Sequence, residues 1–128
     1  MSDNRIANRY AASLLQLAIE KGKVDRVHED MKQLGGAIHH NRDLLTLFRS
    51  PVVKADAKSK VLDKVFAGQF DEITSSFLHL VVRKRREDVV PAMTSSFERQ
   101  YNLYKGIVKA RLVTAAPIDE ELRKNLLN

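Results

Sequence analysis

Apolar residues recur at intervals of three and four along most of this chain, and most of these runs end at a glycine, a proline or a cluster of charges. That interval places apolar side chains on one face of an α-helix, whereas a half-buried strand needs an interval of two. Glycine favours the left-handed turn that ends a helix, and proline lacks the amide proton that continues one. The pattern between residues 1 and 105 therefore predicts an all-α fold, a bundle of six helices with short connections.

The predicted helices lie within residues 6–22, 24–38, 41–51, 52–68, 71–88 and 88–104. Asn41 is suited to cap the third helix, because its side chain can accept orphan backbone N–H groups. Gly35 and Gly36 weaken the last turns of the second helix. The sixth tolerates Pro91 in its first turn and is predicted to end before Gly106.

Composition indicates one ordinary folded domain. The chain has 128 residues, of which 44% are hydrophobic and 30% charged, and it contains no cysteine. Disulfides and thiolate metal sites are therefore excluded, and no apolar run is long enough to span a bilayer. The N-terminal ten residues lack the apolar stretch of a signal peptide, so we expect a soluble cytoplasmic protein. A net charge of +6 permits nucleic acid, acidic lipid or an acidic protein as partner without choosing among them.

Two of the predicted helices carry more apolar surface than one core requires. The apolar residues of 6–22 cover an arc of about 240° on a helical wheel, and those of 71–88 cover about 200°. A surface helix of a small domain needs an apolar face only a little over about 100° wide. Something besides the chain's own core is therefore expected to cover these two helices.

The pattern changes after Gly106. Val108, Ala110 and Leu112 alternate with Lys109 and Arg111, which predicts a strand that ends at Pro117. A further helix is expected after Asp119. Because one strand and one helix cannot bury their own apolar faces, residues 106–128 are predicted to begin a second, incomplete α/β domain.

No catalytic or metal-binding constellation is recognisable. His39 and His40 are adjacent, which directs them about 100° apart on a helix and makes them a poor chelating pair. His28 and His79 have no partner nucleophile at a suggestive spacing, and no glycine-rich phosphate loop occurs. We therefore expect a protein that is not an enzyme and that holds no metal and no cofactor.

Four stretches together resemble a known family. They are ANRYAASLLQLA in the first predicted helix, LLTLFRSPVV before the fourth, FLHLVVRKRREDVVPAMTSSFERQYN across the fifth and sixth, and VKARLVTAAPID after them. In this order they are similar to the delta subunit of bacterial F-type ATP synthase, called the oligomycin-sensitivity-conferring protein in mitochondria.

The resemblance implies a non-catalytic stator subunit. In such proteins an N-terminal six-helix bundle, here residues 1–105, binds the N-terminal helix of an alpha subunit in a groove between its first and fifth helices. The C-terminal domain, of which residues 106–128 would be the start, grips the b subunits of the peripheral stalk. The catalytic head is thereby prevented from rotating with the shaft during proton-driven ATP synthesis. Such a subunit works at the cytoplasmic face of the bacterial inner membrane, as a peripheral part of the complex.

The candidate partner-binding residues lie on the two helices with surplus apolar surface. An amphipathic helix bound in a groove is usually held by a few large side chains. The candidates are Tyr10, Leu14, Leu17, Phe77, Leu80 and Val81, with Lys84 at the edge. Each of the six apolar and aromatic candidates could equally be an ordinary core residue, and the charged run around Lys84 could be a solvated turn.

The competing hypothesis is an RNA-binding helical bundle of the kind found in transcription antitermination factors. The basic composition permits it, but charge alone is weak support. Bases stack on exposed aromatic side chains, whereas aromatic residues are only 6% of this chain and its phenylalanines have core spacing. A general six-helix adaptor is a third possibility.

Overall fold

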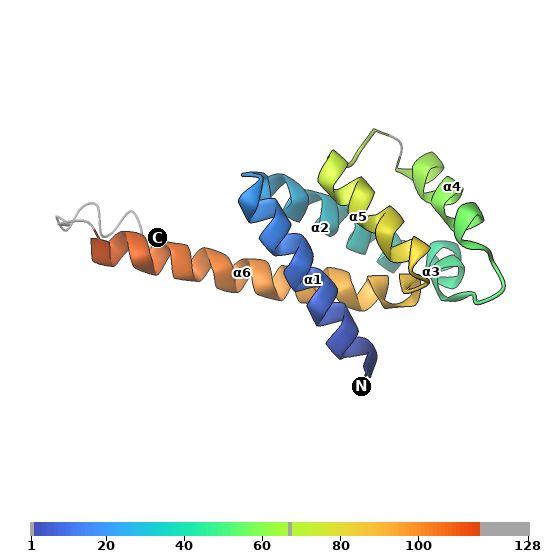
Figure 1. Ribbon diagram of the computed structural model, residues 1–128, viewed down its shortest axis with the longest axis horizontal. Coiled ribbons are helices and arrows are strands. Elements are labelled where there is room, and N and C mark those ends of the chain that lie inside the picture. The colour runs from blue at the N-terminus through green and yellow to red at the C-terminus, as the bar shows by residue number, and fades with distance from the viewer. Residues whose placement is uncertain (1, 67, 116–128) are drawn as a thin grey trace.

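The computed structural model describes residues 2–66 and 68–115, which form six α-helices and no strand (Figure 1). The all-helical fold predicted from the sequence is confirmed for this part of the chain. The helices are α1 (Ser2–Glu20), α2 (Val24–His40), α3 (Arg42–Arg49), α4 (Ala55–Val65), α5 (Glu72–Arg83) and α6 (Val90–Ala115), with a short 3₁₀ helix, η1 (Glu87–Val89), before α6.

The turn after α1 is made by Gly22. Its φ angle is +68°, a left-handed conformation that glycine adopts without steric cost. The Gly22 N–H donates to the Ile19 carbonyl at 3.1 Å and the Lys23 N–H to the Ala18 carbonyl at 2.9 Å. These two bonds satisfy carbonyl groups that the end of a helix leaves unpaired, and they turn the chain directly into α2.

Side-chain caps begin two of the later helices. The Asn41 side chain accepts hydrogen bonds from the N–H groups of Asp43, at 3.0 Å, and Leu44, at 3.3 Å, as the sequence predicts. Asp71 caps α5 in the same way, by accepting from the Ile73 N–H at 3.0 Å. Each cap supplies an acceptor to a backbone donor that has no partner inside its helix.

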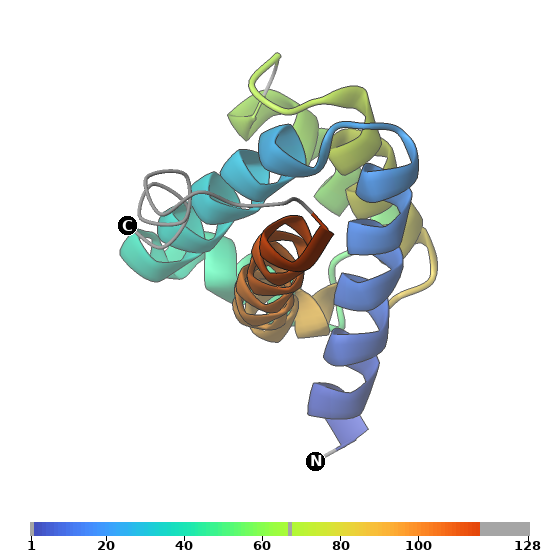
Figure 2. The ribbon, with the colours of Figure 1, turned by 90° about the vertical axis from the view of Figure 1, so that its left-hand side faces the viewer.

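The core is built around α6, which α1 and α2 flank (Figure 2). Several large side chains on these helices and on α5 have no exposed surface at all, and truncating one of them to alanine costs about 2–5 kcal/mol. They are Leu14, Val27, Leu34, Val81, Val82, Val90, Met93 and Phe97.

The prediction for residues 107–112 is wrong. These residues are not a strand, because α6 continues through Gly106 to Ala115 and extends away from the other helices (Figure 1). A helix pairs its N–H and C=O groups within its own segment, whereas a strand needs a neighbouring strand, and none exists among residues 2–66 and 68–115. The cost is apolar exposure at Ile107, Val108 and Leu112. The helix predicted after Asp119 lies outside the described residues.

Within the described part of the chain, none of the helices has both the length and the apolar character that crossing a membrane would require.

Candidate partner-binding groove

An open groove of about 500 Å³ lies between the end of α1 and one face of α5. Its apolar wall is formed by Leu17, Ile73, Phe77 and Leu80. Leu80 keeps 37% of its surface exposed, and Leu17 and Ile73 are half-buried. Charged and polar residues form the remaining lining, namely Lys21, Lys23, Asp71, Glu72 and Ser76. The two helices with surplus apolar surface in the sequence are therefore the two that form this groove.

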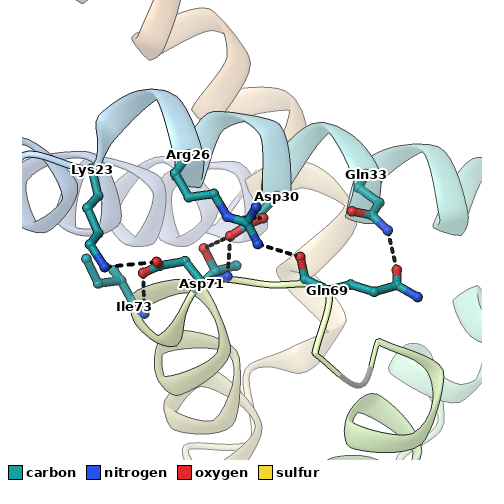
Figure 3. A network of polar contacts seen from close by, with 8 residues as sticks. Lys23, Arg26, Asp30, Gln33, Gln69, Asp71 and Ile73 are labelled. Atoms are coloured by element: carbon teal, nitrogen blue, oxygen red, sulfur yellow. Dashed lines mark hydrogen bonds and ion pairs between the residues drawn. The ribbon is translucent and has the colours of Figure 1, made fainter.

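A buried carboxylate on α2 fixes the start of α5 (Figure 3). Asp30, only 2% exposed, accepts a hydrogen bond at 2.8 Å from the Asp71 N–H and another at 2.8 Å from the Thr74 hydroxyl. These donors belong to the N-cap and the first turn of α5. Asp30 thus acts as a second cap on α5, supplied by a different helix, and holds the groove wall in place.

Surface contacts extend this polar network around Asp71 and Asp30 (Figure 3). Lys23 forms an ion pair with Asp71 at 3.1 Å. Arg26 contacts Asp30 at 3.4 Å and donates to the carbonyl of Gln69 at 2.7 Å. The Ile73 N–H, and after it Lys23, hold the pKa of Asp71 below its ordinary value. The carboxylate of Asp71 is therefore kept ionised at the end of the groove.

Tyr10 lies against the groove wall through an aromatic contact. Its ring meets that of Phe77 edge to face, with centroids 6.1 Å apart and planes at 82°. Such contacts stabilise a pair of rings by about 0.5–1.5 kcal/mol beyond simple burial. Tyr10 is half-buried and so remains accessible beside the groove.

The structure separates the predicted site residues into three groups. Leu17, Phe77 and Leu80 line the groove, and Tyr10 flanks it. Leu14 and Val81 have no exposed surface, so they support the groove from the core and do not face a bound molecule. Lys84 is exposed just after α5 and lies outside the lining. Partner binding by these residues stays a prediction.

Sequence reasoning missed some of the lining residues. Ile73 is spaced four and seven residues before Phe77 and Leu80, so its place on the same face was available from the helical period. Lys21, Glu72 and Ser76 carried no such signal. They line the groove only because the end of α1 lies beside the start of α5.

Part of the charged run after α5 is structural. Arg85 has a φ angle of +59°, which is unusual for a residue with a side chain. Its guanidinium group donates to the carbonyls of Val53 at 3.1 Å and Pro51 at 3.3 Å, so it holds the loop before α4. Lys84 and Arg86, its neighbours, remain exposed.

A buried ion pair lies beneath this turn. The Lys58 ammonium group is 2.5 Å from Glu87 Oε1 and donates to the Ser50 carbonyl at 2.7 Å. Both side chains are at least nine-tenths buried. The pair links α4 to η1 beneath the exposed cations.

Metal-binding chemistry has no candidate in the described ranges, since residues 2–66 and 68–115 contain no group of three or more His, Cys, Asp or Glu side chains suited to hold an ion. His39 and His40 touch each other edge to face, with ring centroids 5.2 Å apart.

The described residues therefore form an all-helical domain with an open apolar groove. The family model of the ATP synthase delta (OSCP) subunit matches residues 6–128. The chain belongs to this family. ATP synthase subunit delta of Cytophaga hutchinsonii is 39% identical over 125 residues, which cover 98% of this chain and 69% of the relative. The same subunit of Syntrophomonas wolfei is 32% identical over 126 residues, with 98% and 69% covered. That of Chlorobaculum parvum is 31% identical over 128 residues, with 100% and 71% covered. Neither the family match nor these relatives support the RNA-binding alternative.

Proposed function

We propose that this protein is a peripheral-stalk subunit of ATP synthase that ties the catalytic head to the stationary stalk. Its role is mechanical, because a head that is tied down does not rotate with the shaft during proton-driven ATP synthesis. The bundle of residues 1–105 binds the N-terminal helix of an alpha subunit, and residues 106–128 begin the part that binds the b subunits. The protein acts as a peripheral component at the cytoplasmic face of the inner membrane.

The open groove between α1 and α5 is the observation that carries this proposal. An amphipathic helix binds such a groove by inserting apolar residues spaced three, four and seven apart. Leu17, Ile73 and Leu80 offer partly exposed apolar surface to such anchors, and Phe77 forms the wall behind them. Family membership supports the choice of an ATP synthase subunit as the occupant.

The test is a calorimetric titration of the whole chain with a synthetic peptide that has the sequence of the alpha-subunit N-terminal helix. Binding in the micromolar range or tighter is expected. Leu80→Ala removes groove surface that is already part-exposed, so it weakens binding about tenfold with little change in melting temperature. Tyr10→Ala also weakens it, through loss of the ring against Phe77.

Leu103→Ala is the matched control, because Leu103 is 70% exposed on α6 and lies outside the groove. It leaves peptide affinity unchanged. The proposal is overturned if the peptide does not bind, or if Leu103→Ala weakens binding as much as Leu80→Ala. Single-stranded RNA is titrated in parallel at two salt concentrations, and salt-sensitive RNA binding without peptide binding would favour the alternative.

A further inference from the structure

A second hollow runs along the junction of α2, α3 and α6 and shares no lining residue with the groove. Two adjoining cavities of about 390 and 340 Å³ make it up. Both are lined by Gly35, Thr94 and Ser95, so they form one continuous trough. We call this surface the basic trough, because Lys32 lines one of its ends and Arg42 and Arg49 line the other.

The charge of the basic trough is unbalanced. Lys32, Arg42 and Arg49 are exposed, and none of them forms an ion pair with any residue in the described part of the chain. The one carboxylate among its described lining residues belongs to Glu98, whose Oε2 is 2.5 Å from His28 Nε2. His39 also lines it. Carboxylates from another molecule would complement these cations.

Close packing of helices requires a glycine at only one of the two glycine positions of α2. A Cβ atom at Gly35 would lie 3.3 Å from the Thr94 hydroxyl, so close packing of α2 on α6 accounts for that glycine. A Cβ atom at Gly36 would meet nothing within 4 Å. Glycine weakens a helix interior, and packing does not require it at Gly36. Gly36 lines the trough, where a missing side chain lets another molecule approach the backbone.

We propose that the basic trough binds an acidic peptide segment of a partner protein. Its carboxylates pair with Lys32 at one end and with Arg42 and Arg49 at the other, and its backbone passes over Gly36. Arginine pairs with carboxylates through two parallel hydrogen bonds, which favours a peptide whose acidic groups are held in a defined position.

A peptide fits this surface better than the other anionic partners. Bases would stack on exposed aromatic rings, and among the described lining residues the only aromatic ring is that of His39. A membrane surface is usually bound by clusters of about four to eight Lys or Arg side chains, whereas Lys32, Arg42 and Arg49 are the only Lys or Arg among the described lining residues.

The experiment uses the whole chain, labelled with ¹⁵N, and an octapeptide of Asp, Glu and Gly as probe. Binding is expected to change the amide signals of Gly35, Gly36 and Ser95 and to weaken as salt is added. An octapeptide of Asn, Gln and Gly should have no effect. The double substitution Arg42→Glu and Arg49→Glu should lower affinity at least about tenfold. The same charge change at Lys60 and Lys64, exposed on α4, should alter it less than about twofold.

Gly36→Ala should change thermal stability and peptide affinity in opposite directions. Alanine favours the helix and meets no neighbour, so the melting temperature rises, while the added methyl group narrows the trough and weakens peptide binding. A purely structural glycine would show the first effect without the second. The proposal is overturned if Gly36→Ala leaves affinity unchanged, or if both double substitutions act alike. It is also overturned if single-stranded RNA or phosphatidylglycerol vesicles, and not the acidic peptide, perturb the trough signals.

Discussion

Among the polar groups around the groove, the buried carboxylate of Asp30 should be the one whose substitution lowers the free energy of unfolding most. Asp30→Ala leaves the Asp71 N–H and the Thr74 hydroxyl without the acceptor that each now has at 2.8 Å. A hydrogen bond to a charged group contributes about 1.5–3 kcal/mol, and the ion pair with exposed Arg26 adds little. We therefore expect the free energy of unfolding to fall by about 3–5 kcal/mol. Asp30→Asn, which keeps one acceptor oxygen, should cost about 1–2 kcal/mol.

The assay is urea unfolding followed by circular dichroism, together with titration of the alpha-subunit peptide. Glu29→Ala is the control, since Glu29 is the exposed neighbour on the same helix and should change stability by less than about 0.5 kcal/mol. Thr74→Val removes one of the two donors and should fall between the control and Asp30→Ala. Because Asp30 holds the start of α5, its substitution should also weaken peptide binding. If Asp30→Ala costs no more than Glu29→Ala, the inferred role of this carboxylate in fixing α5 is refuted.

Three further changes test other parts of the molecule. The pKa of Asp71 is lowered in the folded state, so the stabilising effect of its carboxylate is present above the ordinary value of 3.8 and is lost as the pH falls through the lower folded value. Asp71→Asn should therefore flatten the acid limb of a curve of stability against pH. An unchanged slope would count against the ion pair and the cap. Lys58→Met leaves Glu87 buried without its ammonium partner and should lower the free energy of unfolding by about 3–5 kcal/mol. Adding Glu87→Leu should restore most of this loss, and thermal unfolding of both variants would measure it. Gly106→Ala should strengthen α6 by up to about 1 kcal/mol and move the ¹³Cα shifts of residues 107–115 toward helical values, whereas extended-type shifts there would contradict the continuous helix.

The separation of groove residues from core residues depended on the structure. Leu14 and Leu17 lie on the same broad apolar face of α1, yet Leu14 is fully buried and Leu17 is half-exposed at the groove. A helical wheel gives the direction of a side chain but not the position of its neighbours. The width of the apolar arc therefore predicted that α1 and α5 carry a surplus, and it left open which residues form that surplus.

At residues 107–112 the local sequence pattern predicts the wrong secondary structure. Their alternation of apolar and charged residues is a genuine strand signal. A strand also requires a partner for its backbone groups, and no strand lies beside these residues in the described part of the chain. With α6 already formed from Val90, continuing the helix pairs each added backbone group without such a partner.

The sequence by itself determined the helical class of this protein, the cap at Asn41, the turn at Gly22 and the two helices with surplus apolar surface. These features depend on interactions between residues a few positions apart, so the order of residues is enough to specify them. Only the tertiary structure decided that Asp30 reaches across to hold α5, that Leu14 and Val81 are core, and that Lys32 and Arg49 border one trough. Those arrangements join residues far apart in the chain, and they exist only once α1, α2, α3 and α5 have packed around α6.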